Sequence, residues 1–309
     1  MITILLAACN GEKHIADQIE SVLNQTLRNW RLIVQDDCSE DRTCEIVEKY
    51  AAMHPDRIVL KKRRIPSGSA KDNYFSMLQY ADSDYIMTCD QDDVWLPDKI
   101  EVTMHKMLEI EKRIGHDRPI LVHTDLKVTD DNLNVLSESL IKYQKLDSSR
   151  DKLNNLLAQN IVTGCTMMVN RALADKAQNL PEQAIMHDWW FAMIASAFGQ
   201  IGFVDKPTVL YRQHAGNAVG AKNVNSIFYK IKRMFTLKQA KMSLAATYAQ
   251  AESFWNIYGD RLGENEKEII QAYLQIPGAN RMERIRIISR HDFWKTGFFR
   301  RCGQIVIRP

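Results

Sequence analysis

The stretch Tyr85–Pro97, YIMTCDQDDVWLP, decides the fold. A short apolar run of strand length leads directly into three carboxylates, and an apolar Trp-Leu-Pro segment follows them. Like charges side by side at a strand end repel each other unless a cation lies among them. In open α/β sheets, the carboxyl end of the strands is also the edge where ligands bind. The stretch therefore predicts a divalent-cation site for a phosphorylated ligand, formed by Asp90, Asp92 and Asp93.

The first half of the chain predicts a doubly wound α/β sheet. An unbroken apolar run near the N-terminus is typical of a strand that is buried on both faces in a parallel sheet. Apolar residues at helical spacing follow it, and strands and helices then alternate. The expected strands are Thr3–Cys9, Arg31–Val34, Ile58–Leu60 and Tyr85–Met87, and the expected helices carry Ile15 to Leu23, Ile46 and Val47, Tyr74 to Leu78, and Ile100 to Leu108.

The second half is less regular, and its strand signals fade after Gly220. Helical patterns then take over, among them an apolar pattern interleaved with lysines over residues 227–241. We therefore expect two domains, residues 1–220 and a basic helical region of residues 221–309. In the later part of the first domain, the expected elements are strands at Ile120–His123, Thr166–Val169 and Thr208–Tyr211 and a buried helix at Asp188–Phe198.

Charge is distributed unevenly along the chain. Residues 220–309 hold 16 Lys and Arg against 7 Asp and Glu, whereas the first 219 residues hold 25 against 31. A basic tail on an acidic body indicates contact between the tail and an anionic surface, such as a membrane. Helices that pack on the body and show their lysines to water are the alternative. The acidic body argues against nucleic-acid binding.

The cysteines and the apolar runs indicate the compartment. The six cysteines are scattered and form no CxxC pair, which argues against a disulfide framework or a zinc site and favours a reducing cytosol. No run approaches the roughly 20 apolar residues of a membrane-spanning helix.

Two further groups could contact a nucleotide. Asp36-Asp37 ends the second expected strand, where a carboxylate can accept a hydrogen bond from a base or a ribose. Lys71 opens the helix after the Gly68 loop and could contact a diphosphate. The alternative for one of the two aspartates is a helix N-cap. The alternative for Lys71 is an ordinary surface lysine.

Two later groups could carry chemistry. In Met186–Phe191, MHDWWF, Asp188 lies in partly apolar company that can raise its pKa toward that of a useful base, and indole faces suit sugar rings. A helix cap followed by core aromatics is the alternative. His214 follows the last expected strand and could complete the metal shell, although a surface or core role is more common for a single histidine.

Together these elements resemble the family 2 glycosyltransferases of the GT-A fold. The signatures are ILLAACNGEKHIADQIESVLNQT, LIVQDDCSEDRT and YIMTCDQDDVWLPDKIE, followed by MHDWWF and YRQHAGN, and their order and spacing match over residues 1–220. DQDDVW with VTGCTMMVN, MHDWW and YRQH is most similar to bacterial rhamnosyltransferases of cell-wall and capsular polysaccharide assembly.

This resemblance implies a Rossmann-like central mixed sheet flanked by helices, with a C-terminal helical region. It also implies inverting, metal-dependent transfer with Mg²⁺ or Mn²⁺. The implied donor is dTDP-L-rhamnose, and the implied acceptor is a lipid-linked saccharide at the cytoplasmic face of the cell membrane. A homodimer is compatible with it.

Carried over to this sequence, the resemblance assigns roles to particular residues. The first strand departs from many relatives, because Ala7-Ala8-Cys9 stands where they carry Thr or Ser and Tyr. No QxxRW signature of processive synthases is present. The implied nucleotide-sugar contacts are Ala7, Asn10, Asp37, Lys71, Asp90 and Gln91, the metal ligands are Asp90, Asp92 and His214, the general base is Asp188, and the acceptor or sugar contacts are Trp95, Trp189 and Trp190.

Three alternatives stay open. A related enzyme could use a UDP-hexose donor. The motif from Asp90 to Val94 also fits the start of a haloacid-dehalogenase-type phosphatase, but that class carries it on the first strand, and three strands precede it here. A carbohydrate-binding or scaffold protein with a decayed site is the third alternative, but it would not require both of the carboxylate sets proposed above.

Overall fold

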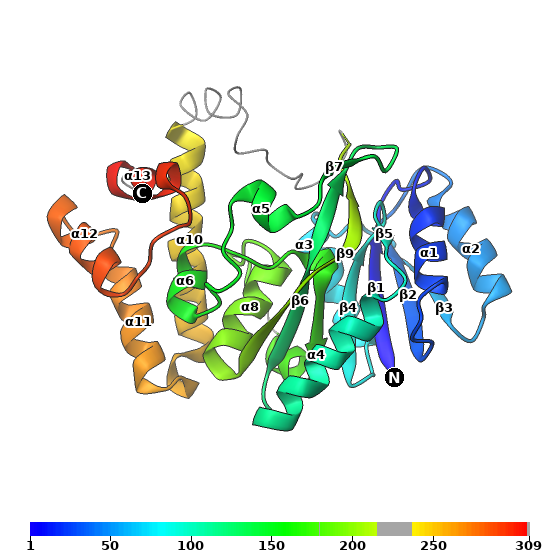
Figure 1. Ribbon diagram of the computed structural model, residues 1–309, viewed down its shortest axis with the longest axis horizontal. Coiled ribbons are helices and arrows are strands. Elements are labelled where there is room, and N and C mark those ends of the chain that lie inside the picture. Colours follow the sequence, from blue (N-terminus) through cyan, green and yellow to red (C-terminus); the bar gives the residue numbers. More distant parts are fainter. Residues whose placement is uncertain (179, 215–236, 308–309) are drawn as a thin grey trace. The chain divides into compact units, whose positions relative to one another are not determined.

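The computed structural model describes residues 1–178, 180–214 and 237–307 (Figure 1). The chain falls into two compact units that alternate along the sequence. The expected domain boundary near Gly220 lies outside the described residues, as does most of the lysine-rich pattern over residues 227–241. The first unit comprises Met1–Leu140, Val162–Gln178 and Gln200–Ala221, and the second comprises Ile141–Ile161, Asn179–Gly199 and Lys222–Pro309.

Within the described residues, one nine-stranded mixed sheet forms the core of the first unit. Its strand order is β3-β2-β1-β4-β8-β6-β9-β5, with β7 beside β6. Strands β8, β5 and β7 run antiparallel to their neighbours, and the other pairs are parallel. The mixed sheet confirms the predicted fold class. The strands are β1 (Ile2–Ala8), β2 (Trp30–Asp36), β3 (Ile58–Lys62), β4 (Tyr85–Asp90), β5 (Val94–Trp95), β6 (Ile120–Thr129), β7 (Val135–Ser137), β8 (Met167–Asn170) and β9 (Gln200–Arg212).

Helices on the sheet explain why the first strands read as unbroken apolar runs. Consecutive residues of β1, such as Leu5 and Leu6, are fully buried, because both faces of the sheet are covered. Helix α3 packs on β1, α2 on β3, and α4 on β6, β8 and β9. The helical segments of this unit are α1 (Ile15–Leu23), α2 (Thr43–Met53), α3 (Ala70–Met77), η1 (Leu78–Tyr80), α4 (Lys99–Ile114), η2 (Gly164–Thr166) and α7 (Arg171–Lys176).

The strand register brings acidic residues to one edge of the sheet. In β1, Ala7 pairs with Asp90 at the end of β4, and Ala8 pairs with Asp36 at the end of β2. Because the three strands are parallel, their carboxyl ends meet at this edge. The expectation that the Asp36-Asp37 pair lies near the end of the first strand is confirmed.

The described part of the second unit is helical. Its core includes Trp190, which packs against Phe254 and Tyr258 with ring centroids 5.3 and 6.0 Å away. No described helix combines the length and the apolar character that crossing a bilayer requires. Its helices are α5 (Leu140–Gln144), which begins in the first unit, α6 (Leu153–Ala158), α8 (His187–Phe198), α10 (Leu237–Tyr258), η3 (Gly259–Arg261), α11 (Glu264–Gln275), α12 (Arg281–Arg290) and α13 (Phe298–Val306).

The structure adds strands that the sequence patterns did not indicate. Strand β5 has two residues, too few to show a period, and it lies antiparallel to β9 directly after the acidic turn. Strand β9 is also longer than expected and ends at Arg212. The pairing of β5 with β9 carries the end of β9 to the acidic turn.

Candidate functional site

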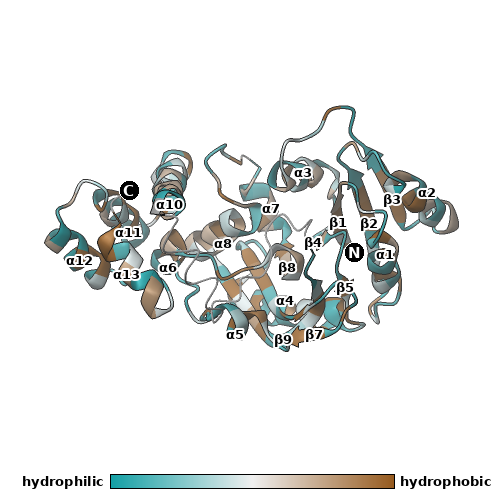
Figure 2. Cartoon of the chain, turned by 90° about the horizontal axis from the view of Figure 1, so that it is seen from above, coloured by the Kyte–Doolittle hydropathy of each residue, from teal (hydrophilic) through white to brown (hydrophobic). Residues whose placement is uncertain are grey.

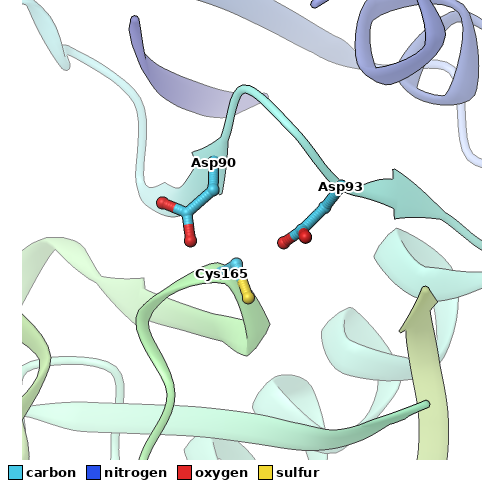
Figure 3. A group of neighbouring side chains, drawn as sticks. All are labelled: Asp90, Asp93 and Cys165. Atoms are coloured by element: carbon cyan, nitrogen blue, oxygen red, sulfur yellow. The ribbon is translucent and has the colours of Figure 1, made fainter. Parts of the chain in front are cut away.

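The acidic turn after β4 gathers potential metal ligands. Asp90 ends β4, and Asp93 lies three residues further on, before β5. Their carboxylates and the Cys165 thiol offer ligand atoms within 4.8 Å of one another, and Figure 3 shows the three side chains as neighbours. No other such group was found among the residues that the structure describes.

Burial and neighbouring charges raise the pKa of both carboxylates. Burial, and then the Asp92 charge, raise the pKa of Asp90 to about 6. Burial, followed by the charges of Asp90 and Asp92, also raises the pKa of Asp93 well above its usual value. A divalent cation would replace these protons and remove the repulsion between the carboxylates. The electrostatics of the turn therefore fit a bound cation.

The Cys165 thiol is a neighbour of the carboxylates rather than a ligand suited to Mg²⁺ or Mn²⁺. Burial and the charge of Asp93 raise its pKa well above the usual value, so it stays protonated. Hard cations also prefer oxygen. Thr88 on β4 holds η2 in this place by donating a hydrogen bond to the Gly164 carbonyl at 2.6 Å.

Arg212 organises the acidic turn from β9. Its Nε donates to the Asp92 carbonyl at 2.9 Å, and its backbone N–H donates to Asp93 Oδ1 at 3.2 Å. The guanidinium also bonds the Asp131 carbonyl and Asp17 Oδ2, at 2.6 and 2.9 Å. The motif YRQH alone does not predict this role for Arg212. Its position two residues before His214 was the available signal.

His214 and Asp92 form a second pair beside the turn. The His214 Nε2 lies 2.8 Å from Asp92 Oδ2. The ring of His14 lies 5.3 Å from that of His214, and its Nε2 is 3.1 Å from Asp131 Oδ1. The structure therefore brings His214 to the acidic turn. The predicted ligands Asp90, Asp92 and His214 do not form one close group in the described residues, where Asp90 lies with Asp93 and Cys165 and His214 pairs with Asp92.

Tyr74 fixes the first carboxylate. Its buried hydroxyl lies 2.6 Å from Asp90 Oδ1 and also donates to the Cys89 carbonyl. Burial raises the pKa of Tyr74, so the phenol keeps its proton and serves as a donor. The helical pattern of the sequence predicts Tyr74 only as an apolar helix position.

Gln91 joins the acidic turn to the loop after β1. Its Oε1 accepts from the Cys9 N–H, and its Nε2 donates to the Cys9 carbonyl, both at 2.8 Å. A Cβ on Gly11 would lie 2.3 Å from Gln91 Oε1, so this contact requires glycine at residue 11. The side chain that was predicted to contact the nucleotide sugar thus pairs with backbone in this structure.

The other predicted nucleotide contacts lie around the carboxyl ends of β1 and β2. Ala7 is partly exposed near the end of β1. Asn10 follows with φ of 49°, and its Oδ1 accepts from the Glu40 N–H at 2.9 Å. Asp36 is buried and accepts from the Ser39 N–H at 3.0 Å, which is a structural turn contact.

Asp37 is the more accessible aspartate of its pair. It accepts hydrogen bonds from Ser67 N and Oγ at 2.7 and 2.6 Å, and Arg63 Nε lies 3.2 Å from its Oδ1. These donors hold the carboxylate at the carboxyl edge of the sheet. Lys71 lies in the first turn of α3, partly exposed.

Two of the predicted sugar-binding indoles are core residues. Trp95 is buried, and the Lys99 ammonium lies 4.8 Å from its ring centroid. Trp190 is fully buried in the second unit. A buried ring face cannot stack on a sugar, so burial argues against that role at both positions in this structure. Of the three indoles predicted to contact a sugar, Trp189 is partly exposed, and its Nε1 donates to the Leu156 carbonyl at 2.6 Å.

Asp188, the predicted base, lies in the first turn of α8 in the second unit. Its Oδ1 accepts from Asn160 Nδ2 at 3.2 Å and from the Trp189 N–H at 2.6 Å. Its side chain is buried in this structure. Met186, and not Asp188, occupies the N-cap position.

Comparison with known proteins identifies the family. Residues 3–176, more than half of the chain, match the sequence profile of Glycosyl transferase family 2. The chain belongs to this family. The match includes the acidic turn, Asp37 and Gln91, and it confirms the resemblance inferred from the sequence motifs.

Relatives of the family 2 chain include enzymes with different donors. It is 25% identical over 234 residues to the dTDP-rhamnosyl transferase RfbG of Shigella flexneri, covering 70% of this chain and 74% of RfbG. It is 34% identical over 109 residues to WfgD of Escherichia coli, a UDP-Glc:alpha-D-GlcNAc-diphosphoundecaprenol beta-1,3-glucosyltransferase, covering 35% of this chain and 42% of WfgD.

Solved structures show the same fold at low sequence identity. TarS residues 1–349 of S. aureus in complex with UDP align at a TM-score of 0.59 and 17% identity, covering 91% of this chain and 73% of TarS. The mannosyltransferase PcManGT of Pyrobaculum calidifontis in complex with GDP-Man and Mn²⁺ aligns at a TM-score of 0.56 and 16% identity. The alignment covers 93% of this chain and 73% of PcManGT. The family 2 chain has the GT-A fold of these enzymes.

Proposed function

We propose that this family 2 glycosyltransferase moves L-rhamnose from dTDP-L-rhamnose onto a lipid-linked glycan, with inversion at the anomeric carbon. The proposed setting is bacterial cell-wall or capsular polysaccharide synthesis at the inner face of the cell membrane. The observation that carries the proposal is the acidic turn of Asp90, Asp92 and Asp93, which lies at the carboxyl end of β4 under mutual repulsion. The similarity to RfbG over 70% of the chain supports rhamnose as the sugar.

In the proposed reaction, Asp90, Asp92 and His214 would hold Mg²⁺ or Mn²⁺, which would neutralise charge on the leaving nucleoside diphosphate. Tyr74 bonds the Asp90 carboxylate, and Arg212 bonds the backbone carbonyl of Asp92. Asp37 would accept a hydrogen bond from the pyrimidine base, and Ala7, Asn10 and Lys71 would line the nucleotide side.

Asp188 would take the proton from the acceptor hydroxyl as that oxygen attacks the anomeric carbon. Asn160 and the Trp189 N–H hold its Oδ1 in place. One displacement on the face opposite the leaving group inverts the anomeric centre, so a β-linked donor would give an α-rhamnoside.

A UDP-hexose donor is the second candidate. The similarity to WfgD, at 34% identity over 109 residues, favours it. A panel of nucleotide sugars with Mn²⁺ or Mg²⁺ separates the two, with thermal shift and donor turnover as readouts. We expect dTDP-rhamnose to give the larger responses, and larger responses to UDP-glucose would contradict the rhamnose proposal.

The proposed base is tested by Asp188→Asn. We expect at least a hundredfold loss of transfer, the range of general-base catalysis, with the donor-induced thermal shift retained. Asp260→Asn, at an exposed acid of the same unit, is the control and should keep wild-type activity. An active Asp188→Asn enzyme would remove Asp188 from this role.

A further inference from the structure

Helix α13 exposes its apolar side to solvent. Positions 298, 302 and 306 follow at intervals of four and share one helix face, and position 299 borders it. Phe298, Phe299 and Val306 are 75, 63 and 66% exposed, and Cys302 between them is half-buried. Figure 2 shows the hydropathy of this helix and of its neighbours. A surface helix normally buries such a face.

Hydrogen bonds hold the polar side of α13 inward. Gln304 is only 6% exposed, accepts from the Lys295 N–H at 2.8 Å and donates to the Phe293 carbonyl at 2.9 Å. Arg300 donates to the Gln144 carbonyl at 2.9 Å. Rotating the helix to bury its phenylalanines would break these bonds and leave buried polar groups unpaired. The outward apolar face is therefore a stable feature of the fold.

The segment that carries this face is rich in cations. Residues 281–307 contain seven Lys and Arg against two Asp and Glu. Arg286 and Arg290 on α12 and Arg301 on α13 are exposed, and α12 and α13 pack together. Met282 on α12 adds a further exposed apolar side chain.

We propose that this face, formed by Phe298, Phe299, Cys302 and Val306 with the cations of α12 and α13, docks on an anionic lipid surface. Phenyl rings among arginines match the acyl chains and acidic headgroups of such a surface. A second copy of the chain would bring like charge against like charge, which disfavours self-association through this face. The inference builds on the lipid-linked acceptor of the proposed function and names the surface that would meet the membrane.

The test is sedimentation of the full chain with vesicles of phosphatidylcholine, with and without phosphatidylglycerol. We expect the wild type to sediment with the anionic vesicles and to be released by high salt. Phe298→Ser with Phe299→Ser should lower this binding at least tenfold. Val135→Ser with Leu136→Ser, at an exposed apolar pair on β7, is the matched control and should bind like the wild type.

A variant with fewer cations separates the electrostatic contribution to vesicle binding from the apolar contribution. Arg286→Gln with Arg290→Gln should weaken binding to anionic vesicles and leave thermal stability unchanged, because both side chains are exposed. Equal binding of this variant and the wild type would contradict the electrostatic part of the proposal.

Three outcomes would overturn the proposal. The wild type could fail to bind anionic vesicles, or the phenylalanine variant could bind as tightly as the wild type. Light scattering could also show a wild-type dimer that the phenylalanine variant dissociates, which would make a second copy the occupant. The donor-induced thermal shift tests the proposed function separately, because it requires no membrane.

Discussion

The side chains that shape the acidic turn act largely through backbone groups. Arg212 bonds the carbonyl of Asp92, Tyr74 that of Cys89, and Gln91 both backbone groups of Cys9. These contacts fix the backbone of the turn, while Tyr74 and the Arg212 N–H each also bond one carboxylate oxygen, of Asp90 and of Asp93. These residues are therefore positioning residues for the predicted ligands.

The Gln91 contact gives a prediction at this scale. Gln91→Glu keeps the shape but replaces the Nε2 donor with an oxygen that faces the Cys9 carbonyl. Losing the hydrogen bond and placing two acceptors against each other should destabilise this loop arrangement by about 1–3 kcal/mol. Because the loop is proposed to bind the donor, we expect the KM for the donor to rise about tenfold, with a smaller change in kcat. Steady-state kinetics measure this effect.

Gln79→Glu is the control for added charge, since Gln79 is exposed on η1. If both variants keep the wild-type KM, the contact between Gln91 and Cys9 has no part in donor binding.

At the scale of elements, Asn170 joins three segments of the sheet unit. It is buried at the end of β8, where its Oδ1 accepts from the N–H groups of Ile120 on β6 and Leu173 on α7, at 2.9 and 3.1 Å. Its Nδ2 donates to the carbonyls of His116 and Arg118, at 3.2 and 2.8 Å. One amide thus caps α7 and anchors the start of β6.

Removing this amide should destabilise the unit. We expect Asn170→Ala to lower the free energy of unfolding by about 3 kcal/mol, from the lost N-cap and the buried groups left unpaired. Asn170→Asp keeps the acceptor of the cap but loses both donors, so it should also be destabilising. Urea unfolding measures both variants, and an Asn170→Asp protein as stable as the wild type would show that the two donor contacts contribute nothing.

At the scale of the whole molecule, buried imidazoles lower the stability of the folded chain at acid pH. His123 on β6 is buried, with its ring centroid 4.9 Å from that of Phe203. Burial, and then the charge of Lys99, lower its pKa from 6.5 to about 3. In the unfolded chain it takes up a proton near pH 6.5, so its contribution to stability is present above that pH and is lost as pH falls toward 3.

This linkage predicts a pH-dependent effect of His123→Phe. Between pH 7 and pH 4 the wild type should lose on the order of 3 kcal/mol more stability than the variant, because a pKa shift of one unit corresponds to about 1.4 kcal/mol. Urea unfolding at both pH values measures the difference. His105→Phe, at an exposed histidine of α4, should keep the wild-type pH dependence, and an identical acid loss in His123→Phe would refute the assignment.

The sequence by itself determined the parallel β1-β2-β4 part of the sheet and its acidic edge. Apolar runs of strand length report burial on both faces, and parallel strands necessarily end at the same edge. The carboxylates after Cys89 and the pair after Gln35 could therefore be assigned to that edge before the structure was known. The family motifs also follow from the sequence alone.

Only the tertiary structure decided what holds this edge together and which residues it leaves exposed. Arg212 bonds a carbonyl 120 positions away, and Cys165 reaches the carboxylates through η2. Periodicity reports which face of an element is buried but not which distant segment covers it. For the same reason, the outward apolar face at Phe298 could not be deduced from the pattern of its own helix.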